Sequence, residues 1–280
     1  MCHTQDFRAS GAACLRFMLV ILPAIALGVP AMIAGGVSPA LWGQQIAAFV
    51  VFSLLLALLS RCALRLPSGA AACLCLAALY AALFFPAVGG VRRWLDLGLY
   101  HVNAAMLVLP ALLWLLAGMD RPYPALIAAA AALCLQPDFS QLTALVLGAL
   151  PILWRKREHG YRSAAVLLIL FALAVRCYAV PTALEPAAHS EGILAMLGGL
   201  SPVMRPAGWL ALALIPGSFA IRFARGGETG ALCLAAYYAA VLFFSLTGKY
   251  PVPFMGFGLS PIAGYALAGL LCAQTEKARV

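Results

Sequence analysis

Charged side chains that could do chemistry occur in four short stretches between long apolar runs. The first stretch, residues 89–98, contains Arg92, Arg93, Trp94 and Asp96. Two neighbouring guanidiniums can bind phosphate oxygens through paired hydrogen bonds, so this stretch is a candidate for binding a phosphorylated ligand. The alternative is that both arginines contact lipid headgroups while Asp96 forms a local salt bridge.

The second stretch places a carboxylate at a break between two apolar runs. Asp138 follows Gln136 and Pro137 there. It could take part in a site at the membrane surface. Asp is also a favoured N-cap, so capping of the next helix is the alternative role.

The third stretch, residues 181–192, contains Glu185, His189 and Glu191. A carboxylate beside an apolar cavity can have a raised pKa and act as a general base, with a histidine as its hydrogen-bond partner. The alternative is a solvated polar loop. One histidine and two glutamates do not form a recognisable zinc ligand set, so we predict no metal.

The fourth stretch, residues 247–261, is rich in proline and glycine and contains Lys249. Broken backbone at membrane depth is tolerated only against protein or a cavity, and a helix that begins there presents N–H groups to an anion. A plain structural turn is the alternative.

The composition is that of an integral membrane protein. Of 280 residues, 65% are hydrophobic and only 10% are charged, and the mean hydropathy is +1.00. About 20 residues cross the hydrocarbon layer once. We therefore expect an all-α, polytopic bundle of about ten transmembrane helices in a single domain, 1–280. The expected spans are 17–36, 43–60, 68–88, 99–118, 123–136, 141–154, 163–180, 206–222, 230–246 and 257–273. The first is read as an uncleaved helix rather than a signal peptide.

The net charge of +9 reflects topology rather than nucleic-acid binding, because the basic residues lie in small groups between apolar runs. A cytoplasmic N-terminus puts thirteen of the 18 Lys and Arg residues on the inner side. These are Arg8, Arg16, Arg61, Arg65, Arg121, Arg155, Lys156, Arg157, Arg162, Arg222, Arg225, Lys277 and Arg279. This bias predicts that both termini are cytoplasmic. The four candidate stretches then lie at the outer face.

The nine cysteines predict neither a disulfide framework nor a redox site. No CxxC spacing occurs, and most of the cysteines lie within or at the ends of apolar runs, where Cys acts as a small apolar residue.

Four ordered motifs resemble the SEDS family (shape, elongation, division and sporulation; the RodA, FtsW and SpoVE type). Residues 90–98 resemble its G-x-x-R-W-[IL]-D-L-G segment, and 136–139 resemble the start of its Q-P-D-x-G-T-A segment. Residues 186–191 resemble P-E-A-H-T-D, and 253–260, ending in Ser260, resemble P-F-v-S-Y-G-G-S. The resemblance covers most of the chain.

Several departures from the family pattern bear on activity. The family's long outer loop between helices seven and eight is mostly missing, and Glu191 stands where the family has an aspartate treated as catalytic. Val102 to Ala105 replace the family's Gln-Pro-Ser-Glu. Ser140 and Gln141 replace the glycine of the second motif and shift its threonine.

The resemblance implies a glycosyltransferase that polymerises lipid II at the outer face of a bacterial inner membrane, in cell division or cell-shape maintenance. It implies that Glu191, His189 and Asp138 carry or organise the catalysis. The predicted substrate-binding residues are Arg92, Arg93, Trp94, Asp96, Lys249 and Ser260. Lipid II and membrane lipids are the expected partners, with a class B penicillin-binding transpeptidase beside them. No cofactor and no nucleic acid is expected.

Two other functions fit the same motifs. A catalytically silent paralogue would keep the fold as a membrane scaffold, or would bind lipid II beside a transpeptidase. A lipid-linked sugar transporter would need polar residues through the membrane, and the helix interiors here are nearly uncharged.

Overall fold

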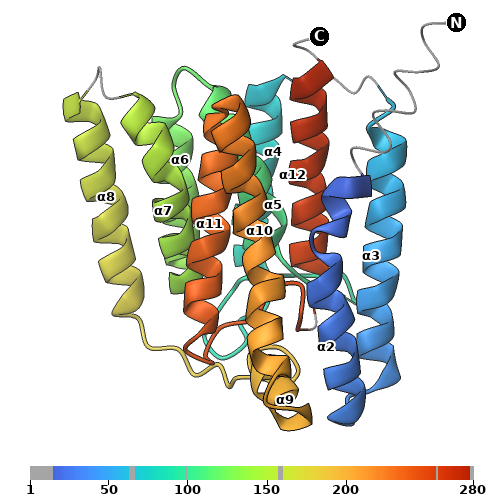
Figure 1. Cartoon of the computed structure of the whole chain (residues 1–280). Helices are drawn as coiled ribbons and strands as arrows, with labels where there is room; N and C mark the ends of the chain where they lie inside the picture. The colour runs from blue at the N-terminus through green and yellow to red at the C-terminus, as the bar shows by residue number, and fades with distance from the viewer. Residues whose placement is uncertain (1–14, 63–66, 99, 157–159, 257, 278–280) are drawn as a thin grey trace, which may run out of the picture.

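The computed structural model describes residues 15–62, 67–98, 100–156, 160–256 and 258–277, which form a bundle of long helices (Figure 1). The long helices are α2 (Leu22–Ala34), α3 (Pro39–Leu59), α4 (Ser68–Ala81), α5 (Ala104–Gly118), α6 (Tyr123–Leu135), α7 (Phe139–Arg155), α8 (Gly160–Tyr178), α10 (Met204–Gly226), α11 (Thr229–Ser245) and α12 (Leu259–Lys277). A 3₁₀ turn, η1 (Ala82–Phe84), continues α4, and the short α9 (Ile193–Leu200) precedes α10. Arg8, Arg65, Arg157 and Arg279, named above, lie outside the described residues, as does residue 257 of the fourth motif.

Each of the ten predicted spans coincides with one long helix, so the all-α polytopic architecture is confirmed. The first span is not one continuous helix. Residues 15–19 are helical, the helix is interrupted at Val20 and Ile21, and α2 then begins just before Pro23. Proline has no N–H to continue a hydrogen-bonded ladder and disfavours helical backbone at the residue before it, which accounts for the break.

The fourth predicted span begins too early, because its first residues belong to a β-hairpin. Strands β1 (Trp94–Asp96) and β2 (His101–Asn103) pair antiparallel, with Trp94 opposite Asn103. Asn103 then caps α5, its Oδ1 accepting a hydrogen bond from the Met106 N–H at 3.0 Å. An N-cap residue has non-helical backbone, so α5 begins only at Ala104.

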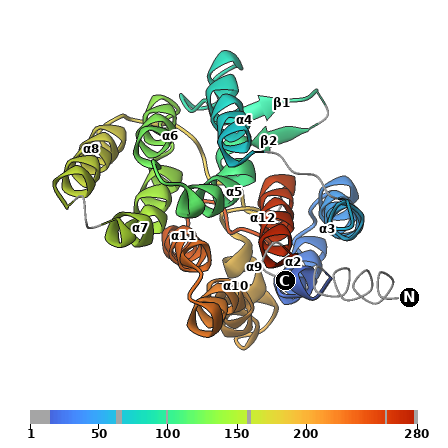
Figure 2. The same ribbon diagram turned by 90° about the horizontal axis from the view of Figure 1, so that it is seen from above.

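Consecutive long helices run in opposite directions, so the start of α4 and the C-terminal end of α12 lie at the same end of the bundle (Figure 1). The hairpin, α9 and the loops around 136–138, 179–203 and 246–258 lie at the other end. Helix α5 lies near the centre and packs on α4, α7, α11 and α12, whereas α8 lies at the edge beside α6 and α7 (Figure 2).

Burial follows this arrangement. Nearly every side chain of α5 from Ala104 to Ala117 is buried, while outer helices expose large apolar side chains such as Leu54, Leu168 and Leu210. Apolar surface of this extent is suited to lipid rather than water. By length and composition, α3, α8 and α10 can each cross a membrane, and the other seven are shorter apolar helices.

Small residues allow the central helices to approach closely. A Cβ atom on Gly264 of α12 would collide with the carbonyl oxygen of Met106 on α5, and one on Gly28 of α2 would collide with that of Met255. Helices in lipid associate through this kind of close backbone contact. The cysteines within the described residues form no disulfide.

Candidate functional site

The first motif places a buried arginine where the chain leaves α4 and η1. Gly89 and Gly90 both have positive φ, +57° and +81°, which residues other than glycine rarely adopt. The carbonyl of Gly89 accepts a hydrogen bond from the Ala183 N–H at 3.0 Å, so this turn is fixed against the loop after α8. Arg93 follows and is 5% exposed, with its Cζ 4.5 Å from the ring centroid of Trp94.

Asp138 lies next to this arginine. Its Oδ2 is 3.8 Å from Arg93 Nη1, and its side chain is fully buried. Its Oδ1 accepts hydrogen bonds from the Gln141 N–H at 3.3 Å and from the Ser140 hydroxyl at 3.0 Å. Asp138 is therefore the N-cap of α7, as the capping alternative predicted, and it also neutralises Arg93.

Gln136 holds the turn that presents Asp138. Its Nε2 donates to the Leu79 carbonyl at 2.6 Å, and its own carbonyl accepts from the Arg92 N–H at 3.3 Å. These two bonds join the end of α6 to α4 and to the first motif. The buried pair of Arg93 and Asp138 is thus set by backbone contacts on both sides.

Glu191 closes a tight turn in the loop before α9. Its Oε2 accepts from the Ala187 N–H at 2.8 Å, and the Ala187 carbonyl accepts from the N–H groups of Ser190, Glu191 and Gly192. The Glu191 residue is 7% exposed. Two oxygens of a carboxylate offer about four acceptor positions, so this bond leaves the carboxylate able to accept a proton.

The loop between α11 and α12 packs on this turn. The Val252 N–H donates to the Ser190 carbonyl at 3.2 Å, and a Cβ on Gly256 would lie 2.7 Å from that carbonyl oxygen. Ser260, in the first turn of α12, accepts from the Asn103 N–H at 2.7 Å. The third and fourth motifs are therefore held against each other and against the hairpin.

Two cavities lie between these segments. The Asp138 cavity, about 380 Å³, is lined by Arg93, Asp138, Lys249 and Tyr250 among others. The Glu191 cavity, about 270 Å³, is lined by Arg93, Trp94, Glu185, Glu191 and Ser260 among others. Arg93 lines both, so a single buried guanidinium connects them.

Three predicted residues line neither cavity. Arg92 is exposed, and its Nη1 donates to the Leu83 carbonyl at 3.4 Å. Asp96 is exposed as well; its Oδ1 accepts from the Gly98 N–H at 2.9 Å and lies 3.9 Å from Nε2 of His101. His189 is half-buried on the turn of Glu191. The structure therefore gives Arg92 and Asp96 local roles in the turn and the hairpin.

Tyr250 is a cavity residue that the sequence analysis missed. Burial raises the pKa of its phenol, the negative charge of Asp138 raises it further, and Arg93 acts in the opposite direction. The phenol therefore stays neutral near pH 7 and can donate a hydrogen bond to a ligand. Its position beside Lys249, in a loop already assigned to the site, was the available signal.

The charges suit the two cavities to different groups. Arg93 and Lys249 face one carboxylate in the Asp138 cavity, which leaves a net positive charge for an anion such as a phosphate. The Glu191 cavity is lined by two carboxylates, those of Glu185 and Glu191, together with the Ser260 hydroxyl and the Trp94 ring. Carboxylates beside an aromatic ring are suited to binding and deprotonating a hydroxyl group.

Comparisons with known proteins identify the fold. No family model matches the chain, and no curated protein matches it by sequence. The rod shape determining protein RodA of Thermus thermophilus superposes with a TM-score of 0.63 and 21% identity, over 92% of this chain and 94% of that one. A point mutant of the same protein superposes with a TM-score of 0.64 and 22% identity, over 92% of this chain and 95% of that one. A third structure is described as a peptidoglycan synthase complex that coordinates polymerization and crosslinking. One of its chains superposes with a TM-score of 0.63 and 19% identity, over 94% of this chain and 98% of that one. The chain therefore has a RodA-like, SEDS-type membrane fold, and the resemblance in its motifs is confirmed at the level of the fold.

Proposed function

We propose that the chain is a SEDS-type protein of bacterial cell-wall synthesis that polymerises lipid II at the outer face of the inner membrane. The observation that carries the proposal is the position of Arg93, which is buried between a cavity with net positive charge and a cavity that contains Glu191. A lipid-linked diphosphate fits the first cavity, and a sugar hydroxyl fits the second. The RodA-like fold supports the same assignment.

In this mechanism Glu191 accepts the proton of the acceptor sugar hydroxyl. The hydroxyl oxygen attacks the anomeric carbon of the donor sugar, the bond from that carbon to the diphosphate oxygen breaks, and undecaprenyl diphosphate leaves with the electron pair. Negative charge accumulates on the diphosphate, so fixed cations close to it lower the barrier. Arg93 and Lys249 supply those cations, and the Tyr250 phenol supplies a neutral donor beside them.

Asp138 has a positioning role. Its carboxylate is buried against Arg93 and caps α7, so it fixes the guanidinium between the cavities. A class B penicillin-binding transpeptidase is the proposed partner, since one comparison structure is of a complex that coordinates polymerization with crosslinking. The whole chain, 1–280, acts as one domain in this proposal.

One observation favours a second candidate function, a silent scaffold. Glu191 is nearly buried, and one of its oxygens already bonds within its own turn, as a purely structural glutamate would. Such a protein would keep the fold and bind lipid II or a transpeptidase without polymerising the lipid.

Polymerisation of lipid II by the purified chain, alone and with class B transpeptidases, distinguishes the two candidates. We expect glycan strands from the wild-type protein and none from the Glu191→Gln variant. If no pairing yields strands while lipid II still binds, the scaffold function replaces polymerisation. If no strands form and the protein binds neither lipid II nor a transpeptidase, both assignments fail.

A further inference from the structure

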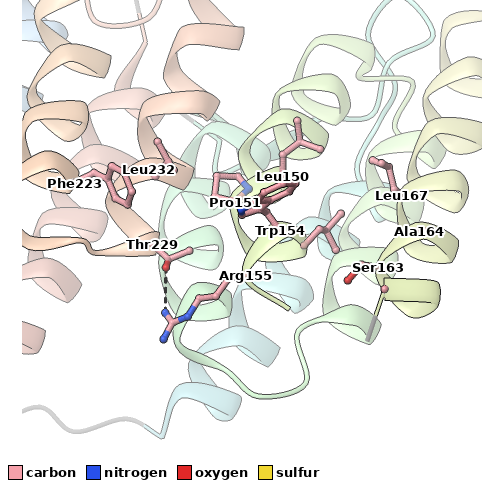
Figure 3. A pocket seen from close by; sticks show the side chains of 12 residues that line it. Leu150, Pro151, Trp154, Arg155, Ser163, Ala164, Leu167, Phe223, Thr229 and Leu232 are labelled. Atoms are coloured by element: carbon pink, nitrogen blue, oxygen red, sulfur yellow. Dashed lines mark hydrogen bonds between the residues drawn. The ribbon is translucent and has the colours of Figure 1, made fainter. Parts of the chain in front are cut away.

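A second cavity system lies at the end of the bundle opposite the candidate site. One cavity there, which we call the α7–α11 cleft, has a volume of about 620 Å³ and is lined mainly by apolar side chains of α7, α8, α10 and α11 (Figure 3). These include Leu150, Trp154, Leu167, Phe223 and Leu232. A volume of this size is within the range of known ligand pockets.

Arg155, at the C-terminal end of α7, is the only charged residue among the described residues that line the cleft. Its Nη1 donates to the Thr229 hydroxyl at 3.1 Å (Figure 3). Among the described residues no carboxylate lies within ion-pairing distance of Arg155, in contrast to Lys156, which lies 3.6 Å from Asp120. A guanidinium has five N–H donors, so most of its donors remain available for an anion at the mouth of the cleft.

Aromatic side chains mark the depth of the cleft in the membrane. Trp154 is 72% exposed and Tyr161 is 73% exposed, next to the two ends of the connection between α7 and α8. Exposed tryptophan and tyrosine collect at the level of lipid headgroups. Arg155 is therefore at headgroup depth, while Leu150 and Leu167 line the cleft closer to the bilayer centre.

The cleft is accessible from the membrane side. Ser163, Ala164 and Leu167 of α8 line one side of the cleft, and Phe223 of α10 with Thr229 and Leu232 of α11 lines the other (Figure 3). The cleft spans only residues 150–155 of α7, which is less than two helical turns. That length is too short to seat a partner's transmembrane helix, whereas an acyl chain can enter from the end.

We propose that the α7–α11 cleft binds an anionic phospholipid, with its phosphate on Arg155 and one acyl chain between α8 and the α10–α11 pair. A guanidinium at headgroup depth, with an apolar cleft below it, matches the two parts of such a lipid. Bound there, the lipid fills the space between the lower part of the cleft's α8 wall and its α10–α11 wall. The proposal does not depend on the function proposed above.

Native mass spectrometry of the full chain in detergent tests this with phosphatidylglycerol and phosphatidylcholine of identical acyl chains. We expect the wild-type protein to retain phosphatidylglycerol about fivefold more tightly, the effect of one cation near the surface. Arg155→Gln should remove this preference and Arg155→Lys should keep it. The matched control is Arg225→Gln, which deletes an exposed arginine at the same end that lines a neighbouring cavity instead.

Ala164→Trp tests the acyl-chain part, because the indole would fill the cleft. We expect it to weaken retention of both lipids while the protein remains monodisperse. Equal losses from Arg155→Gln and Arg225→Gln would mean diffuse surface attraction and would overturn the proposal. So would undiminished lipid retention by Ala164→Trp, or competition by glycerol 3-phosphate alone, which would indicate a free-phosphate site.

Discussion

Arg93 and Asp138 form an ion pair in which both side chains are almost completely buried, with Nη1 3.8 Å from Oδ2. They come from two turns that are 45 residues apart in the sequence and adjacent at one end of the bundle. Neither Asp138 Oδ2 nor Arg93 Nε has a hydrogen-bond partner among the described residues. The pair is therefore held by charge, and each member depends on the other for neutralisation.

Removing both members of this pair should destabilise the protein by less than the sum of the two single removals. Asp138→Asn keeps a good N-cap on α7 but leaves Arg93 as an uncompensated buried cation, and Arg93→Gln leaves the carboxylate uncompensated. We expect each single change to cost about 3–5 kcal/mol. The double variant should lose clearly less than the sum of the two. Unfolding in detergent gives the stability of the wild type, the two single variants and the double variant. Strictly additive losses of stability would mean that the two groups do not interact.

Glu191 allows a base to be removed without loss of the turn. Glu191→Gln keeps an amide oxygen that can accept from the Ala187 N–H, so the turn should survive, but the amide cannot take up a proton. We expect lipid II polymerisation to fall about a hundredfold or more, with unfolding temperature unchanged. Glu191→Asp should lower activity as well, because its shorter side chain withdraws from Ala187 and from the acceptor. If polymerisation survives Glu191→Gln, Glu191 is not the base, and Glu185 or Asp138 becomes the candidate.

Lys249 and Arg92 make a matched pair for testing the anion site. Both are exposed cations at the same end of the bundle, but only Lys249 lines the Asp138 cavity. We expect Lys249→Gln to weaken binding of undecaprenyl diphosphate by about ten- to a hundredfold at low salt, as the loss of a charged hydrogen bond would. Arg92→Gln should have little effect. Equal effects would indicate that both residues merely attract the headgroup region.

Two glycines, Gly256 and Gly258, make it possible to test whether the loop before α12 requires close packing or backbone flexibility. A Cβ on Gly256 would lie 2.7 Å from the Ser190 carbonyl oxygen, whereas on Gly258 the nearest atom is Cδ of Pro261 at 3.4 Å. Gly256→Ala must push the loop away from the turn of Glu191, at a cost of about 1–3 kcal/mol, and should lower polymerisation. Gly258→Ala should have a stability and a polymerisation activity close to those of the wild type. Equal losses from the two would mean that the loop requires flexibility rather than contact.

Hydropathy along the chain was sufficient to predict the ten long helices, because the tendency to partition into lipid is a local property of each run. Their ends were less predictable. The hairpin of β1 and β2 was missed although Gly98, between two short strands, was a signal for it. Helix α9 was missed because eight apolar residues after Gly192 are too few to count as a span.

The candidate site depended on contacts that no local pattern contains. The four stretches lie at one end of the bundle, but no local pattern separates Arg93, which is buried, from Arg92, which is exposed. The difference arises because Arg93 packs against Trp94 and Asp138, whereas Arg92 reaches back to the Leu83 carbonyl. Tyr250 was missed for the same reason: its burial depends on how the last loop packs.

We expect both termini to lie in the cytoplasm. The structure brings the described members of the predicted inner set to the end of the bundle where α12 ends, since they occupy every second connection (Figure 1). Arg93 and Lys249 lie at the opposite end. Because basic residues near helix ends are retained on the cytoplasmic side, this separation orients the bundle. Alkaline phosphatase fused after Arg157 or after Arg225 should be inactive, and fused after Lys249 it should be active. The opposite pattern would show that the protein has the reverse orientation. The Glu191 and Asp138 cavities would then lie on the cytoplasmic side, where they could not reach lipid II at the outer face.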